Sequence, residues 1–162
     1  MKTNSRNLKK SYNLLLLLSV LLLLFWKSTK RVQASKPTNY AEFYEVLAQK
    51  GFSSDIAKVI TSVAAWETAN FKSPLYVTSN NCFGMHKPKT WKSRCVAATD
   101  SGYCVYNNFF DSVCDYVYWC DRFILGVHQD PIRQVEAMKQ NDYFTAPLKE
   151  YKKGVLFYYN KL

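Results

Sequence analysis

One acidic residue lies on the apolar face of a predicted helix, where its carboxyl group can take part in acid–base chemistry. The apolar face consists of Ile56, Val59, Ile60 and Val63. Glu67 follows the first of these by eleven residues, or about three helical turns. The helix is predicted to begin at Ser53 or Ser54, so its negative end faces Glu67, and burial and the dipole both raise the pKa of this carboxyl group. A carboxylic acid that stays protonated near neutral pH can serve as the general acid of a glycosidase.

The same pattern has a simpler interpretation. The Glu67 side chain would then turn to solvent at the helix end or pair with a buried cation. Taken alone, the pattern favours this structural interpretation, because a single carboxylate at a helix end is common in proteins and usually has no catalytic role.

The cysteines and histidines do not form the spacing of a metal site. The five cysteines are Cys82, Cys95, Cys104, Cys114 and Cys120, and the two histidines are His86 and His128. No C-x-x-C pair occurs, which argues against a structural zinc site. The sequence suggests no organic cofactor either. Cys95 and Cys104 flank a predicted turn, and a hairpin there could place their sulfur atoms opposite one another, depending on its register. If Gly102 adopts a left-handed conformation in a three-residue loop, the two side chains point to opposite faces instead.

The charge of the chain is concentrated at its N-terminus. The 162 residues contain 22 Lys and Arg against 12 Asp and Glu, and seven of the cations precede residue 35. The remaining 128 residues hold 15 cations and 12 acids, so they are nearly balanced. This distribution argues against a nucleic-acid partner, which would need a basic surface on the folded domain. With 48% apolar residues, the chain can bury one sizeable core.

The N-terminal residues have the pattern of an export signal. Four cations precede the apolar run Leu14–Trp26, and Val32-Gln33-Ala34 offers a cleavage site before Ser35. Residues 1–34 are therefore predicted to be a signal peptide or, if uncleaved, a short membrane anchor. The rest of the protein would be secreted, periplasmic or held at the outer face of the cytoplasmic membrane. Residues 35–39 are predicted to be a linker, and residues 40–162 the catalytic domain.

Around Glu67 the sequence predicts helices and one hairpin. We expect a helix at Tyr40–Gln49, loop structure at 73–84, and strands near Trp91–Ala97 and Tyr103–Phe110 joined by the turn Asp100-Ser101-Gly102. A further helix would begin at Ser112 as N-cap, with Asp115 bonding back in a capping box. The last two helices are predicted at Pro131–Lys139 and from Pro147 onward.

Several short motifs occur in an order typical of one enzyme family. They are Ala64-Ala65-Trp66-Glu67-Thr68, Ser73-Pro74, Asn80-Asn81-Cys82-Phe83-Gly84-Met85, Tyr106 with Phe110–Tyr116, and Asn141–Pro147. In this order the sequence resembles the glucosaminidase domain of bacteria and phages (glycoside hydrolase family 73 type). The resemblance covers about residues 40–162, and it favours the catalytic interpretation of Glu67.

The resemblance implies a fold, a reaction and a partner. The fold would be mainly α, an α+β lysozyme-like helical domain with a small β-hairpin lobe beside the cleft. The reaction would be hydrolysis of the β-1,4 bond after N-acetylglucosamine in peptidoglycan, with Glu67 protonating the leaving oxygen. The partner would be a peptidoglycan glycan strand, bound by a monomer without metal or cofactor.

The resemblance also assigns roles to other residues. Asp100 is the acid of the hairpin lobe and a candidate second catalytic group, although it is also a favourable turn residue. Tyr143 matches a family tyrosine that lines the cleft and would steady the acetamido group or the transition state; the alternative is a core tyrosine. The residues expected to shape the cleft loop and bind substrate are Asn81, Phe83, Gly84 and Tyr106.

Departures from the family pattern leave other functions open. Ala69 replaces a frequent glycine, Cys82 and His86 alter the loop, and Lys149 stands where a second tyrosine is expected, with Tyr151 two places on. The alternatives are an inactive glycan-binding module on the same fold, N-acetylmuramidase specificity, and a membrane-tethered interaction protein.

Overall fold

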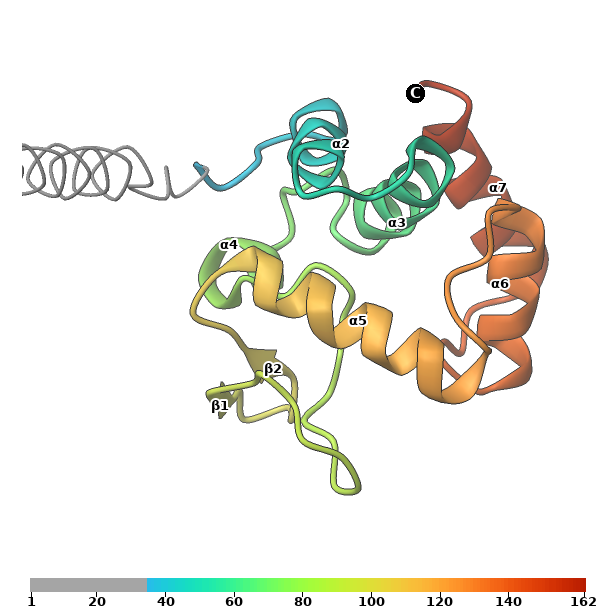
Figure 1. Cartoon of the computed structure of the whole chain (residues 1–162). Coiled ribbons are helices and arrows are strands. Elements are labelled where there is room, and N and C mark those ends of the chain that lie inside the picture. The colour runs from blue at the N-terminus through green and yellow to red at the C-terminus, as the bar shows by residue number, and fades with distance from the viewer. Residues whose placement is uncertain (1–34) are drawn as a thin grey trace, which may run out of the picture. The chain divides into compact units, whose positions relative to one another are not determined.

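The chain is mainly helical, with one small antiparallel sheet (Figure 1). The computed structural model describes residues 35–162. Its helices are α2 (Tyr40–Gln49), α3 (Ser54–Glu67), α4 (Pro74–Ser79), α5 (Phe109–Phe123), α6 (Pro131–Gln140) and α7 (Leu148–Tyr159). Its strands are β1 (Ala97–Ala98) and β2 (Cys104–Val105). The predicted mainly α class is therefore confirmed.

The expectations for the N-terminal segment lie outside the described residues. They are the signal peptide or anchor at residues 1–34 and the membrane contact through Leu14–Trp26. Within residues 35–162, none of the helices is both long and apolar enough to cross a bilayer.

Helix α3 lies in the middle of the helical domain and is buried along most of its length. It contacts α2 on one side and α7 on the other, and α7 also contacts α6. Its buried residues are Ala57, Val59, Ile60, Thr61, Ser62, Val63, Ala64 and Ala65. Several of them are small, which lets neighbouring helices approach closely. Glu67 is thus carried by the most buried helix of the fold.

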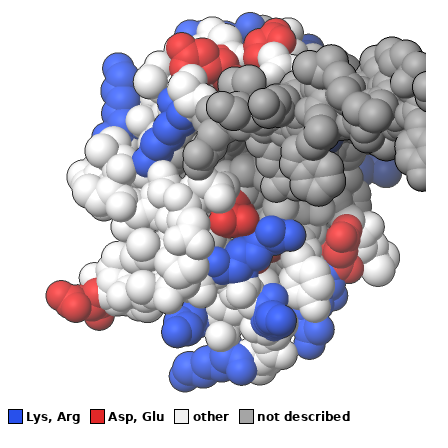
Figure 2. All heavy atoms as spheres, turned by 60° about the vertical axis from the view of Figure 1, so that its left-hand side comes forward, with Lys and Arg blue, Asp and Glu red and all other residues white. Residues whose placement is uncertain are grey.

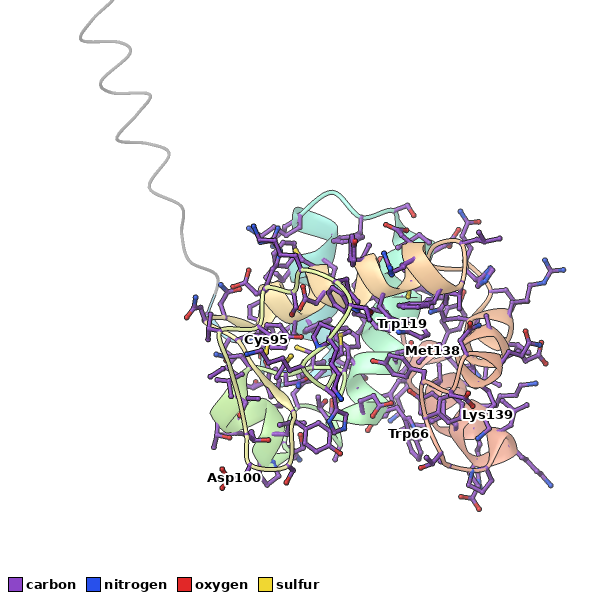
Figure 3. All side chains as sticks on the ribbon, turned by 90° about the horizontal axis from the view of Figure 1, so that it is seen from below. Trp66, Cys95, Asp100, Trp119, Met138 and Lys139 are labelled. Carbon is purple, nitrogen blue, oxygen red and sulfur yellow. The ribbon has the colours of Figure 1, made fainter. Side chains whose placement is uncertain are left out.

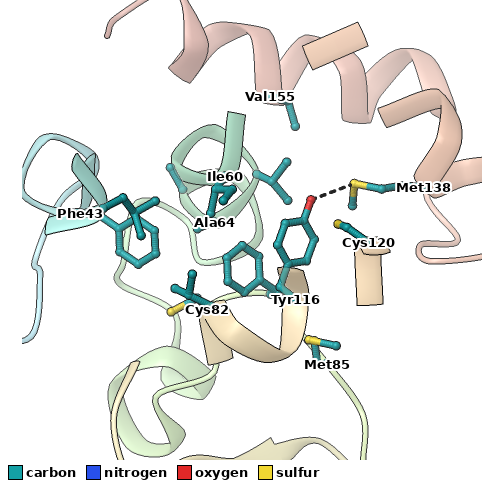
Figure 4. Close-up of a cluster of buried hydrophobic side chains, with 14 of the residues drawn as sticks. Phe43, Ile60, Ala64, Cys82, Met85, Tyr116, Cys120, Met138 and Val155 are labelled. Carbon is teal, nitrogen blue, oxygen red and sulfur yellow. Dashed lines mark hydrogen bonds between the residues drawn. The ribbon is translucent and has the colours of Figure 1, made fainter. Parts of the chain in front are cut away.

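The buried core around α3 is rich in aromatic and sulfur-containing side chains (Figure 4). Tyr116 of α5 stacks on Phe83 with ring centroids 4.2 Å apart. Its hydroxyl accepts a hydrogen bond of 2.8 Å from Gln134 Nε2 and lies 3.4 Å from Met138 Sδ. These contacts join the loop after α4, helix α5 and helix α6 in one buried cluster, and they satisfy the buried polar groups.

The N-cap of helix α5 lies four residues earlier than predicted. Its N-cap is Asn108, whose side chain accepts a hydrogen bond of 3.0 Å from Asp111 N. Ser112 lies inside the helix and donates to Phe109 O instead, so its predicted capping role is wrong. Asp115 is buried and accepts hydrogen bonds from Ser93 Oγ and Arg94 N. Asp115 therefore links the segment before the hairpin to α5 through hydrogen bonds and does not cap the helix.

The hairpin is much shorter than predicted, but its turn has the expected form. The register pairs Ala98 with Cys104, and Gly102 has φ +83° at the end of a three-residue loop. Cys95 therefore does not pair with Cys104 across the ladder, and all five cysteines are free thiols. Residues 73–84 were expected to form a loop, but Pro74–Ser79 forms the short helix α4, capped by Ser73.

The residues predicted as a linker pack onto the domain. Pro37 is buried, and its carbonyl accepts a hydrogen bond of 2.6 Å from the Tyr76 hydroxyl. Lys36 Nζ donates to Val77 O at 2.9 Å, near the end of α4. The compact unit of the described residues therefore includes the predicted linker from Lys36 onward.

Charged side chains of both signs are interspersed on the face shown in Figure 2. The described domain also contains ion pairs between them, such as Arg94 with Asp111 at 3.2 Å and Lys152 with Glu136 at 2.5 Å. This mixture agrees with the near balance of charge in the sequence after residue 34.

Candidate active site

Glu67 is the last residue of α3, and the chain turns sharply after it. Thr68 caps the helix end: its hydroxyl donates to Ala64 O at 2.6 Å and accepts from Phe71 N at 2.8 Å. Ala69, Asn70 and Phe71 all have left-handed backbone conformations, with φ of 50°, 55° and 64°. Ala69 thus occupies a backbone conformation that glycine adopts without strain, which gives a physical reason for the glycine frequent at this position in the resembled family. The turn holds the half-buried Glu67 carboxyl group in a fixed place.

One oxygen of this carboxyl group is held by a tyrosine from α7. The hydroxyl of Tyr151 donates a hydrogen bond to Glu67 Oε1. Tyr151 is 2% exposed, stacks on Phe144 at 3.7 Å between ring centroids, and meets Trp66 edge-on at 6.2 Å. Burial, and then the charge of Glu67, raise the pKa of the Tyr151 hydroxyl well above 10. Tyr151 therefore stays protonated and acts as a donor to Oε1.

The other oxygen faces Gly84, where the chain has no side chain. A Cβ at position 84 would lie 3.6 Å from Glu67 Oε2, and Gly84 itself has φ +61°. Because Oε1 accepts from Tyr151, a proton on this carboxyl group is held on Oε2. The acidic proton thus lies on the oxygen beside Gly84, which is one of the residues that line the pocket described below.

Burial raises the pKa of Glu67 above its ordinary value of 4.5, and the hydrogen bond from Tyr151 opposes part of this rise. No other acidic side chain contributes to the shift. The raised pKa agrees with the direction predicted from the sequence, with desolvation as the main cause.

This shift predicts a pH-dependent stability. The folded protein favours protonated Glu67, so wild-type protein should lose stability as the pH rises from about 4.5 through the higher folded pKa. Glu67→Gln stays neutral and should not show this loss. Urea unfolding at pH 4 and pH 7.5 should therefore show the variant gaining stability relative to wild type at the higher pH. A difference that is the same at both pH values would contradict the raised pKa.

A pocket of about 340 Å³ is lined by Gly84, the neighbour of Glu67 Oε2, whereas Glu67 itself is not among the lining residues. Its lining residues are Gly84, Met85, His86, Lys87, Pro88, Lys89, Thr90, Trp91, Trp119, Phe123, Asn141, Asp142 and Tyr143. The ring centroids of Trp119 and Tyr143 are 4.6 Å apart, and those of Trp119 and Phe123 5.5 Å apart. Aromatic rings beside polar groups are suited to a sugar, which has apolar faces and a polar edge.

Two of the predicted site residues meet beside Glu67. Tyr143 donates a hydrogen bond of 2.7 Å to Phe83 O, one residue before Gly84, and both Tyr143 and Gly84 line the pocket. Burial and then the negative charge of Glu67 raise the pKa of Tyr143. Tyr143 therefore supports the loop and lines the pocket at the same time.

The other predicted loop residues are buried and do not line the pocket. Asn81 is buried and holds the loop together, donating to Met85 O and Cys104 O and accepting from Phe83 N and Met85 N. Phe83 is 1% exposed in the core. Tyr106 is 2% exposed, with its hydroxyl 4.0 Å from Met85 Sδ. These three side chains are buried and are not among the residues that line the pocket, and their contact with substrate stays a prediction.

Asp100 is not brought to Glu67. It is exposed in the turn of the hairpin, and Figure 3 shows it at the edge of the molecule, well apart from Trp66, the neighbour of Glu67. The acid that lines the pocket is Asp142, which is exposed and has φ +53°.

Three aromatic residues of the site were not among the predicted site residues. Trp66, Trp119 and Tyr151 are brought to it by packing of α3, α5 and α7. For Tyr151 a signal existed, because it lies two places after the position where a family tyrosine is expected. Within residues 35–162, no three His, Cys, Asp or Glu side chains come together to hold a metal ion.

Comparisons with known proteins bear on the fold. No known protein family matches the sequence, and no curated protein matches it. One solved structure, a type VI secretion system effector–immunity complex from Pseudomonas protegens, contains a similar chain. The similarity has a TM-score of 0.61 at 13% identity and covers 75% of this chain and 89% of the other. It shows that the helices are arranged in the same way.

Proposed function

We propose that this protein is an exported peptidoglycan hydrolase that cleaves the β-1,4 bond after N-acetylglucosamine. The observation that carries the proposal is the state of Glu67, whose half-buried carboxyl group has a raised pKa. Tyr151 holds one of its oxygens, and the other lies beside Gly84, one of the residues that line an aromatic pocket. The proposal includes a lysozyme-like relationship of the fold and export through residues 1–34.

In the first step of the proposed reaction, Glu67 Oε2 gives its proton to the glycosidic oxygen as the bond to the anomeric carbon breaks. The nucleophile is the acetamido oxygen of the substrate's own N-acetylglucosamine, which bonds to the anomeric carbon. This bond closes a five-membered ring. Water then attacks the anomeric carbon, which opens the ring, and gives a proton to the Glu67 carboxylate, which restores the acid. The proposal uses the substrate's own acetamido group as nucleophile because no acidic side chain perturbs the pKa of Glu67, as a nucleophilic carboxylate about 5 Å away would. The alternative is an inverting reaction with a second carboxylate about 6.5–9.5 Å away, and it would give a product of the opposite anomeric configuration.

The test uses the full chain on isolated peptidoglycan. Released fragments are reduced and identified by mass spectrometry. New reducing ends on N-acetylglucosamine would support the proposal. Ends on N-acetylmuramic acid would replace it by muramidase specificity, and no release from several wall types, with glycan binding retained, would replace it by the inactive binding module.

Tyr151→Phe provides a test of the hydrogen bond to Glu67. This bond lowers the pKa of Glu67, so its loss should raise that pKa and move the alkaline limb of the kcat–pH profile to higher pH. We expect kcat at the optimum to fall about tenfold, because the carboxyl group loses its fixed orientation. Tyr159→Phe, on the same helix, is the matched control and should leave the profile unchanged. An unmoved alkaline limb in Tyr151→Phe would contradict this role.

A further inference from the structure

The segment between Gly84 and Trp91 forms one wall of the pocket and carries its positive charge. We propose that Lys87 and Lys89 make the pocket a binding site for an acidic sugar, one that bears a carboxylate substituent. These lysines would then select peptidoglycan over neutral polymers of N-acetylglucosamine. The substrate class rests on the proposed function, whereas the preference of the pocket for a carboxylate does not.

The backbone of this wall is held by contacts at both ends, which fixes the two positions from which the lysine side chains extend. His86 forms a bridge with Tyr103 of the hairpin, with ring centroids 4.1 Å apart, and Lys87 N donates to Gly102 O at 3.0 Å. At the other end, Trp91 packs on Tyr118 of α5 at 5.1 Å. In Figure 1 this segment projects from the helical body between α4 and β1. A segment anchored in this way binds a ligand at a smaller entropic cost than a free loop.

The two lysines are available to a ligand. Both side chains are exposed, and in the described domain neither forms an ion pair or a side-chain hydrogen bond. Among the pocket-lining residues the opposing charge is the single carboxylate of Asp142, so with two lysines the lining carries net positive charge. Arg122 lies over the ring of the pocket residue Phe123, with its guanidinium carbon 5.7 Å from the centroid, and adds a third cation nearby. The electrostatic field at this wall favours an anion.

Aromatic residues of the same pocket are suited to the sugar ring itself. Trp119, Phe123 and Tyr143 are among its lining residues, and the Trp119 ring contacts both of the others. A sugar ring that packs on these aromatic faces would lie in the pocket that Lys87 and Lys89 also line. A neutral N-acetylglucosamine unit leaves both ammonium groups unpaired, whereas a carboxylate-bearing unit pairs with them.

Two parts of peptidoglycan present such a carboxylate. One is the lactyl group of N-acetylmuramic acid after the stem peptide has been removed, and the other is the stem peptide. Three probes of equal length distinguish the sources: a neutral chito-oligosaccharide, a glycan with free lactyl groups, and a glycan with intact stem peptides. Binding is measured with the full chain carrying Glu67→Gln, so that no probe is cleaved.

We expect an acidic glycan to bind about tenfold more tightly than the neutral one, the effect of two solvent-exposed charge pairs. Adding Lys87→Gln and Lys89→Gln should reduce its affinity to that of the neutral glycan. High salt should have the same effect on the parent protein, because screening weakens these pairs. The matched control replaces Lys72 and Lys153, which are exposed and do not line the pocket, and should change nothing.

Equal affinities for neutral and acidic glycans would overturn the proposal, as would an equal loss in the control variant. Absence of binding to all three probes would overturn it as well. Its failure is distinguishable from failure of the proposed reaction, because hydrolysis is measured separately with wild-type protein. A protein that cleaves nothing but still prefers acidic glycans through these lysines would be a binding module with the inferred site.

Discussion

Glu67→Gln should lower the rate of peptidoglycan hydrolysis by about 10²- to 10⁴-fold, the usual contribution of a general acid. Gln has nearly the same shape and can still accept a hydrogen bond from Tyr151, so the side chain should stay in place. What it lacks is a proton to give to the leaving oxygen. The comparison is made by initial rates of release of reducing ends at equal protein concentration.

The control for this variant is Glu45→Gln, which removes an exposed carboxylate on α2 and should leave the rate unchanged. Circular dichroism and affinity for a glycan probe show whether the fold and the binding site are kept. Full activity in Glu67→Gln would assign the acid to another group, and Asp142 in the pocket would be the next to replace. A loss of activity together with a loss of folded signal would contradict the expectation that Gln fits the site.

The position of Glu67 could be predicted from the sequence because it depends on one helix. The period of Ile56, Val59, Ile60 and Val63 defines the inward face of α3, and Glu67 continues that face at the helix end. Burial of a carboxyl group then raises its pKa whatever packs against it. The helix Tyr40–Gln49 was likewise predicted with the bounds observed, because Phe43, Val46 and Leu47 have a helical spacing and Lys50-Gly51 is a common stop signal.

The partners of Glu67 could not be predicted in this way, because they depend on tertiary packing. Tyr151 is 84 residues away in the sequence, and it reaches Glu67 because α7 packs on α3. The start of α5 was misplaced because two polar residues competed for one cap: Asn108 bonds Asp111 N, while Ser112 bonds within the helix. The hairpin was predicted too long because much of its β-prone sequence contacts loops and α5 instead of a second strand.

A second large effect is expected from Gly154→Ala in the middle of α7. In a helix interior this change normally stabilises a protein by about 1 kcal/mol, because glycine is the more flexible residue. Here a Cβ would lie 2.2 Å from Trp66 Cε3 and 2.3 Å from Trp66 Cδ2. The indole ring occupies the space that any side chain needs, so we expect a loss of about 1–3 kcal/mol in the free energy of unfolding.

Removing the indole ring should reverse the sign of this effect. In a Trp66→Ala background the space beside Gly154 is open, and Gly154→Ala should then raise the free energy of unfolding, by up to about 1 kcal/mol. Urea unfolding of wild type, both single variants and the double variant gives the coupling energy between the two positions. A coupling near zero, or a stable Gly154→Ala protein with Trp66 present, would contradict the packing of Trp66 on α7.

The same clash should also reduce hydrolysis, because Trp66 lies between α7 and the acid. Trp66 is adjacent to Glu67 in the chain and meets Tyr151 edge-on, so a displaced indole disturbs both partners of the hydrogen bond that orients the carboxyl group. We therefore expect kcat to fall in Gly154→Ala and the alkaline limb of its pH profile to move in the same direction as in Tyr151→Phe. An unchanged pH profile in a destabilised protein would mean that Trp66 holds the helices together without positioning the acid. A shifted profile would make the absence of a side chain at position 154 part of how this fold orients Glu67.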